Sequence, residues 1–183
     1  MENAPEMMEV LNNETLLFRL SSSIQYCSMP FPTSKNKEEI IKLPLHMLLN
    51  LKDHGAKTSC AAVDPSTSTI CVASGKLVQF GSVQDKGDQQ DKGDQEKEDD
   101  NLTDRVSWRE LRLEDNIISL ACSADILVAG EISGRIHVFF GMQEFVKRNL
   151  KPTETVLTWH QSPVTSLQIS ANGTPLLSSL FLD

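Results

Sequence analysis

The sequence has little cysteine, and the cysteines that it has are scattered. The four residues form no C-x-x-C pair, which disfavours both a zinc site and a disulfide framework. They are Cys27, Cys60, Cys71 and Cys122. We expect them to be buried free thiols of an intracellular protein, because such proteins rarely carry structural disulfides.

Long hydrophobic runs and an excess of positive charge are also lacking. No stretch has the roughly 18 apolar residues that a membrane-spanning helix needs. The acidic N-terminal residues lack the positive region and the apolar core of a secretory signal. The formal net charge of −8 disfavours a direct grip on phosphate backbones. We therefore predict a soluble chain that contacts no membrane.

Motifs that carry catalysis are absent as well. The sequence contains no G-x-G-x-x-G, P-loop, H-E-x-x-H or G-x-S-x-G pattern. Its carboxylates cluster only in one low-complexity segment, where no pocket can shift their pKa or hold a substrate. We expect no catalytic, cofactor-binding or metal-ligating residue, no cofactor and no small-molecule substrate. The chain is therefore predicted not to be an enzyme.

That low-complexity segment divides the chain. The hexamer at 84–89 is repeated at 90–95, and residues 85–100 carry eight acids, three lysines and no apolar side chain. Nothing in it offsets the entropy lost on ordering the segment. We predict a disordered acidic insertion over 84–104. The functional alternative is an acidic contact for basic partners.

Outside this insertion the chain contains three similar units, with anchor positions at His54, Leu113 and His160. The anchors are 59 and 47 residues apart, and the longer interval contains the insertion. In each unit, alternating apolar residues precede a turn and a nearly continuous apolar run, which is typical of paired strands. Naming the strands of a unit a to d, we predict 58–63, 70–74, 77–80 and 106–111, then 117–122, 126–130, 136–139 and 155–159, and finally 164–169 and 176–178.

The first two units are expected to share their register. Gly75 and Gly134 are also 59 residues apart, and each supplies a turn between strands b and c, where glycine tolerates positive φ. Within strand a of the second unit, Leu120 and Cys122 should face one side of the sheet and Ala121 the other.

The connection between strands c and d of the second unit contains Lys147, Arg148 and Lys151. We expect a solvated loop there, with a small basic contact patch as the alternative. In the N-terminal part, 14–20 and 23–26 form a candidate hairpin. A strand is predicted at 40–43, because Pro44 disfavours one continuous helix.

The order of these elements resembles a WD-repeat, which forms one blade of a β-propeller. The clearest copy is the third unit, where His160 precedes strand a and Asn172–Gly173 supplies the next turn. The resemblance implies an all-β fold, namely an incomplete WD-repeat β-propeller of about two to three blades with a disordered acidic loop. A chain of this length has fewer blades than a propeller needs, so we expect a partial chain.

The polar set of the usual WD-repeat is incomplete in this sequence. That set comprises a His, a Ser or Thr, an Asp and a Trp, joined by hydrogen bonds. Leu113 stands at the His position of the second unit, Ser133 at the Asp position and Phe139 at the Trp position. We expect packing, and not a polar network, to hold these degenerate units. His54 and His160 are expected to be structural.

The resulting organisation has five parts. We predict an N-terminal segment with a candidate degenerate blade over 1–53, WD-like blades over 54–83 and 105–142, the acidic insertion over 84–104, and the start of a further blade over 143–183.

A narrower resemblance concerns the strand 133–139, the Trp-His step that ends 155–160, and the run 173–178. Together these resemble the WD repeat-containing protein seventy-five family, whose members are subunits of the small-subunit processome. The similarity covers 55–179 without the insertion. It departs from the family at Ser179–Leu180, where the family has Gly-Gly.

This resemblance implies a nucleolar, non-catalytic scaffold in ribosome biogenesis, which supports the transcription and processing of pre-ribosomal RNA. Its partners would be other proteins of a pre-ribosomal assembly, with pre-ribosomal RNA and small nucleolar RNA contacted indirectly. The alternatives are a WD-repeat substrate receptor of a ubiquitin ligase, a signalling adaptor, or a non-catalytic subunit of an RNA-modifying enzyme.

Overall fold

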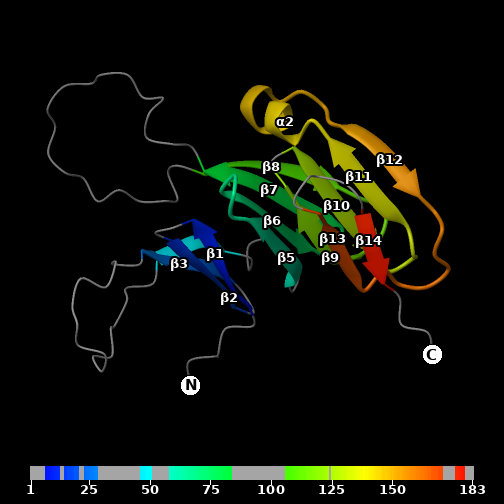
Figure 1. Cartoon of the computed structure of the whole chain (residues 1–183), viewed down its shortest axis with the longest axis horizontal. Coiled ribbons are helices and arrows are strands. Elements are labelled where there is room, and N and C mark those ends of the chain that lie inside the picture. The colour runs from blue at the N-terminus through cyan, green and yellow to red at the C-terminus, as the bar shows by residue number, and fades with distance from the viewer. Residues whose placement is uncertain are drawn as a thin grey trace, which may run out of the picture.

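Strands dominate the computed structural model, which describes residues 7–12, 15–20, 23–28, 46–50, 58–83, 106–123, 125–170 and 176–179. The described strands form three four-stranded antiparallel sheets and one two-stranded sheet. Within each sheet the strands lie in chain order. The first strands of successive sheets contact one another: β5 touches both β1 and β9, and β9 touches β13. The sheets therefore lie side by side as blades (Figure 1).

The bounds of these elements follow the chain. The first sheet comprises β1 (Met7–Asn12), β2 (Thr15–Leu20), β3 (Ser23–Ser28) and β4 (His46–Asn50). The second comprises β5 (Thr58–Asp64), β6 (Thr69–Ser74), β7 (Leu77–Val83) and β8 (Val106–Arg112). The third comprises β9 (Ile117–Cys122), β10 (Ile126–Glu131), β11 (Ile136–Phe140) and β12 (Thr153–Leu157), with the helix α2 (Met142–Arg148) before β12. The last comprises β13 (Ser166–Ile169) and β14 (Leu176–Ser179).

The strands predicted for the three units are confirmed, and so is the N-terminal hairpin, which is the β2–β3 pair. Two strand ends are wrong: β12 stops at Leu157, so Trp159 lies beyond the strand in which it was predicted, and β13 begins at Ser166 and not at 164. Several predicted features lie outside the described residues. They are the strand at 40–43, His54, the acidic insertion at 84–104 and the Asn172–Gly173 turn.

The register shared by the second and third sheets is not the one that the equal glycine spacing predicts. Aligned on the Val-Ala step common to β6 and β10, the β5–β6 hairpin is four residues longer than the β9–β10 hairpin. The β10–β11 turn is three residues longer than the β6–β7 turn. The pairs that define these lengths are Ala62–Cys71 against Cys122–Leu127, and Ser74–Leu77 against Gly130–Ile136. The third sheet therefore has a shorter a–b hairpin and a longer b–c turn than the second. These two changes nearly cancel, and the 59-residue spacing of Gly75 and Gly134 conceals them.

The hydrophobic core lies between neighbouring blades, because both faces of a central sheet are covered. One cluster fills the space between the second and third sheets, another lies between the first and second, and a third lies between the third sheet and β13. Leu120 and Cys122 belong to the first of these clusters and Ala121 to the third, which confirms the predicted alternation along β9.

The connection before β12 is a helix, where the sequence predicts a loop. Met142, Phe145 and Val146 are buried in the core between the second and third sheets, so α2 packs against β7 and β8 of the preceding blade. Arg109 of β8 donates from Nε to the carbonyl of Phe145 at 3.3 Å. The exposure expected for the three basic residues of this connection is confirmed. No described helix is long and apolar enough to cross a membrane.

Backbone contacts fasten each b–c turn to the chain that enters the next blade. In the second sheet, Gly75 accepts a hydrogen bond from the N–H of Ile117 at 2.9 Å. In the third sheet, the carbonyl of Glu131 accepts one from Val164 at 3.3 Å, and the hydroxyl of Ser119 donates to the carbonyl of Val164 at 2.5 Å. The N–H and the carbonyl of Val164, at the start of the last blade, are thereby both held by the blade before it.

Gly134 allows the b–c turn of the third sheet to contact the chain that enters the next blade. It follows a turn closed by its own N–H to the carbonyl of Glu131, and its φ of 90° is the left-handed conformation that ends a three-residue hairpin loop. A Cβ placed on it would lie 2.5 Å from the carbonyl oxygen of His160 and 2.8 Å from that of Ser162. The absence of a side chain therefore lets the turn rest on the backbone of the next blade.

We predict that Gly134→Ala lowers the free energy of unfolding by about 3 kcal/mol, because left-handed strain and a backbone clash add together. Gly141→Ala is the matched control. Gly141 has a φ of 81°, but a Cβ there would meet nothing within 4 Å. This variant should lose only the strain, about 1 kcal/mol. Urea unfolding of both variants checks this, and equal losses would show that the contact with residues 160–162 contributes nothing.

Candidate interaction site

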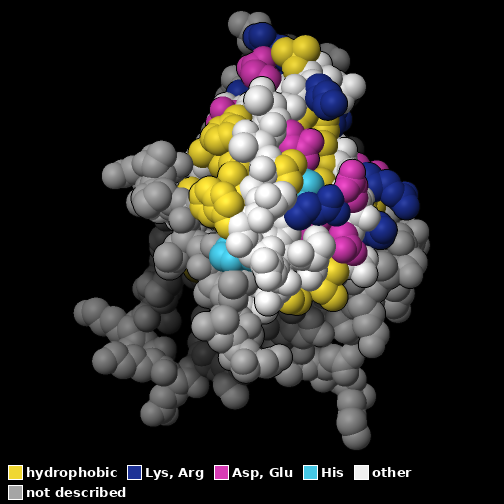
Figure 2. Space-filling model, turned by 90° about the vertical axis from the view of Figure 1, so that its right-hand side faces the viewer, with side chains coloured by type: hydrophobic (Ala, Val, Ile, Leu, Met, Phe, Trp, Pro, Cys, Tyr) yellow, Lys and Arg dark blue, Asp and Glu magenta, His cyan; other side chains and the backbone are white. Residues whose placement is uncertain are grey.

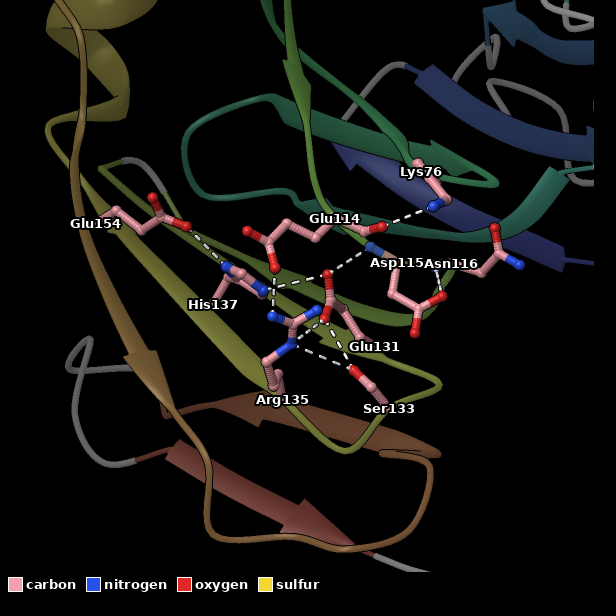
Figure 3. A network of polar contacts seen from close by, with 9 residues as sticks. All are labelled: Lys76, Glu114, Asp115, Asn116, Glu131, Ser133, Arg135, His137 and Glu154. Atoms are coloured by element: carbon pink, nitrogen blue, oxygen red, sulfur yellow. Dashed lines mark hydrogen bonds and ion pairs between the residues drawn. The ribbon is translucent and has the colours of Figure 1, made fainter.

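A network of polar side chains occupies the third sheet (Figure 3). Its centre is Glu131, the last residue of β10, whose side chain is 0% exposed. Ser133, Arg135 and His137 follow it at every second position and contact it or lie beside it. The expectation that packing alone holds this degenerate blade is therefore wrong. The lengthened β10–β11 turn supplies two of these polar residues, Ser133 and Arg135.

Both oxygens of the Glu131 carboxylate have hydrogen-bond donors. Oε1 accepts a hydrogen bond from the backbone N–H of Asp115 at 3.0 Å. Oε2 accepts one from the Ser133 hydroxyl at 2.9 Å and one from Nε of Arg135 at 2.8 Å. Arg135 also pairs with Glu114 at the surface. Because a buried charge without partners costs several kcal/mol, these donors are what allow a carboxylate at this position.

His137 extends the network from the buried carboxylate to the outer strand. Its Nδ1 lies 2.7 Å from Oε1 of Glu154 on β12, and its Nε2 lies 3.2 Å from Oε1 of Glu131. The second approach is close but lacks hydrogen-bond geometry. The imidazole is also stacked on the ring of Phe139, with ring centroids 6.1 Å apart. His137 thus bridges two carboxylates on neighbouring strands.

The surroundings of Glu131 decide its ionisation. Burial opposes the charged form. The hydrogen bonds from Asp115 and Ser133 and the charges of His137 and Arg135 outweigh that effect and lower the pKa of Glu131 below its ordinary value. The carboxylate is therefore the stable form in the folded chain near neutral pH.

This network is arranged to hold the blade, since its central groups are closed to a substrate. Glu131 and His137 are both buried. Among the residues that the structure describes, no group of three or more metal-ligating side chains is placed to bind a metal ion. The arrangement therefore ties β10, β11 and β12 to the residues that precede β9.

The cysteines are free thiols, as predicted, with Cys27 and Cys71 buried and Cys60 and Cys122 half-buried. Burial raises the pKa of Cys27 and raises that of Cys71 strongly, aided by the neighbouring thiol of Cys122. Both remain protonated at neutral pH, and a protonated thiol is a poor nucleophile.

The residues that sequence analysis placed at the WD-repeat positions have different roles, and Ser133 belongs to the polar network. Leu113 and Phe139 are buried in the core between the second and third sheets. His160 is half-buried, and its carbonyl faces Gly134. Sequence analysis missed Glu131 and His137. The signal for them was available as polar residues at every second position from 131 to 137, which an extended chain places on one side.

Exposed apolar side chains gather around β12. Trp159, just beyond the strand, is 74% exposed, and Leu150, just before it, is 54% exposed. Val156 within the strand and Phe140 at the end of β11 are also exposed. Figure 2, which faces the side of the molecule where β12 lies, shows an uncharged strip with hydrophobic side chains on both sides. This β12 surface, made of these four residues and the strand, is the candidate interaction site.

Comparison with known proteins identifies the fold. No protein-family model matches the chain, and no curated protein matches it in sequence. A chain in the crystal structure of the mitotic checkpoint complex matches with a TM-score of 0.57 and 15% identity, over 96% of this chain and 49% of that chain. The WD40 β-propeller domain of Doa1 matches with a TM-score of 0.52 and 8% identity, over the same shares.

The chain therefore folds as an incomplete WD40 β-propeller, as predicted, and spans about half the length of the solved chains that it matches. The described arc has three four-stranded blades and a two-stranded one. Nothing in these comparisons bears on the resemblance to processome subunits, which stays a prediction.

Replacing the buried carboxylate should be costly. We predict that Glu131→Gln lowers the free energy of unfolding by about 3 kcal/mol, because the donors of Asp115, Ser133 and Arg135 lose a buried charged acceptor. Glu114→Gln removes the other carboxylate of Arg135, which is 76% exposed, and should cost less than about 1 kcal/mol. Chemical denaturation of the two variants measures both losses. Similar losses would mean that the network has no buried centre.

The lowered pKa of Glu131 also predicts a pH dependence. Because the carboxyl binds its proton more weakly in the folded chain, its contribution is fully present above the unfolded pKa of about 4.3 and is lost as the pH falls through the folded value. The difference in stability between wild type and Glu131→Gln should shrink in acid below about pH 4. Unfolding curves from neutral to acidic pH test this. A difference independent of pH would contradict an ionised Glu131.

Proposed function

We propose that this chain is part of a non-catalytic scaffold that binds other proteins through the surfaces of its blades. The observation that carries the proposal is the gathering of exposed apolar side chains around β12, with Trp159 the most exposed of them. These side chains lie on both faces and at both ends of an exposed strand, and tryptophan is among the residues that contribute most to binding energy. The WD40-type fold of the solved neighbours is consistent with this role.

We further infer that the assembly is a pre-ribosomal particle, and that the protein acts in the nucleolus in the transcription and processing of pre-ribosomal RNA. The support is the resemblance carried by residues 133–139 and 155–160. In the structure these residues form the turn before β11 and most of β11, the last three residues of β12 and the step into the last blade. The acidic net charge favours protein partners over direct RNA contact.

Affinity purification of the tagged full chain from growing cells tests this function. Recovery of small-subunit precursor RNA and nucleolar assembly proteins, lost when RNA polymerase I is inhibited, is the expected result. A chain with Trp159→Ala and Val156→Ser should recover at least about tenfold less if the β12 surface is the contact. Gln143→Ala, an exposed change on α2, is the control.

Two results would contradict the proposal in different ways. Recovery of cullin-type ligase subunits without precursor RNA would assign the chain to the adaptor alternative. Recovery of precursor RNA that the two substitutions leave unchanged would keep the ribosomal role and remove the β12 surface from it.

A further inference from the structure

The outer strands of the two central blades differ in how their free edges are protected. β8 carries three charged residues, Arg109, Glu110 and Arg112, and α2 packs against it. Such charges and coverings are the usual means by which proteins prevent an edge strand from pairing with another chain. These features disfavour the pairing of a further strand with β8.

Within the part of the chain that the structure describes, the edge of β12 has neither protection. It is the terminal strand of its sheet, and four of its five residues are exposed. Within 153–157 there is no lysine, arginine or proline, and the one charged side chain, that of Glu154, lies 2.7 Å from Nδ1 of His137. Every second residue of such a strand turns its backbone N–H and C=O away from the sheet, where they can bind another strand.

Side chains above and below this edge are suited to a second strand. Val156 lies opposite His137 and Thr155 lies opposite Val138 in the β11–β12 pair, so successive β12 residues point to opposite faces. Val156 is 44% exposed on one face, and Phe140, paired with Thr153, is 43% exposed on the other. Because alternate positions of an added strand share one face, apolar side chains there would contact either Val156 or Phe140.

Charge at the two ends of β12 sets the direction of the added strand. Lys151 lies just before the strand and Lys147 in α2, and both are exposed and without an ion-pair partner in the described structure. Beyond the other end, Trp159 is exposed and residues 158–163 carry no Lys, Arg, Asp or Glu. An occupant complementary to this edge is acidic beside Lys151 and aromatic or aliphatic beside Trp159.

We propose that β12 binds an extended segment of a partner protein by β-strand addition, as an antiparallel strand with alternating apolar residues and an acidic C-terminal end. Antiparallel pairing brings that end beside Lys151 and is the more stable arrangement per residue. A second copy of β12 fits less well, because antiparallel self-pairing places Lys151 next to the partner's uncharged end. This inference rests on the proposed interaction role and names its partner.

The test uses the full chain and a fluorescent capped peptide in which valine and threonine alternate, with phenylalanine at its N-terminal end and two aspartates at its C-terminal end. Binding is followed by anisotropy. Two control peptides keep the composition: one is N-methylated on alternate backbone nitrogens, and the other carries the aspartates at its N-terminal end. The inference predicts saturable binding, with at least about tenfold weaker binding for the N-methylated peptide and several-fold weaker binding for the reversed one.

Variants of the chain locate the site. Thr155→Lys places a charge on the edge and should weaken binding at least about tenfold, whereas Gln143→Lys adds the same charge on α2 and should change it little. The N-methylated peptide keeps the test valid if Thr155→Lys fails to fold, because that arm uses the wild-type chain. Equal binding of the methylated and unmethylated peptides, or no binding at millimolar concentration, would overturn the inference.

Other outcomes separate the competing explanations. A dimer that Thr155→Lys abolishes, and with which the peptide does not compete, would assign the edge to a second copy of the chain and overturn the proposal. Failure of peptide binding together with recovery of precursor RNA would remove strand addition and leave the proposed function intact. Peptide binding without recovery of precursor RNA would keep strand addition and contradict the ribosomal role.

Discussion

The buried carboxylate of Glu131 is the interaction on which the third blade depends. Its side chain holds the turn through Ser133 and Arg135 and holds the chain before β9 through the N–H of Asp115. Its backbone carbonyl accepts the N–H of Val164, where the next blade begins. One residue therefore joins the blade to itself and to its successor. The desolvation cost of the charge makes that junction strict, since each donor is needed to keep the carboxylate buried.

Packing supplies the rest of the architecture, and it does so on both faces of each central sheet. β9 sends Leu120 toward the preceding blade and Ala121 toward the following one. This arrangement is why the inner strands show nearly continuous apolar sequence. Polar side chains on the inner strands, such as His137 of β11, are buried, whereas four of the five residues of the outer strand β12 are exposed. The open edge and exposed apolar side chains of β12 lie on that outer strand, away from the contacts that hold the blades together.

Sequence alone predicted the strands well because alternation and apolar runs directly reflect which side chains are buried. It failed where hairpin lengths differ between blades and where a segment packs against another blade. The spacing of Gly75 and Gly134 concealed two opposite changes in hairpin length, and the α2 helix was missed because Met142, Phe145 and Val146 are buried against another blade. Glu131 was missed because it stands at none of the usual WD-repeat positions. The network that replaces the usual polar set has no fixed motif.

Glu131 organises the contact between blades, and amide hydrogen exchange tests that claim most directly. In the wild type, the amides of Asp115, Gly134 and Val164 should be protected, because each is bonded to Glu131. In Glu131→Gln all three should lose protection together, while Val72 in the second blade keeps it. Loss of protection at Asp115 alone, with Gly134 and Val164 unchanged, would contradict the claim.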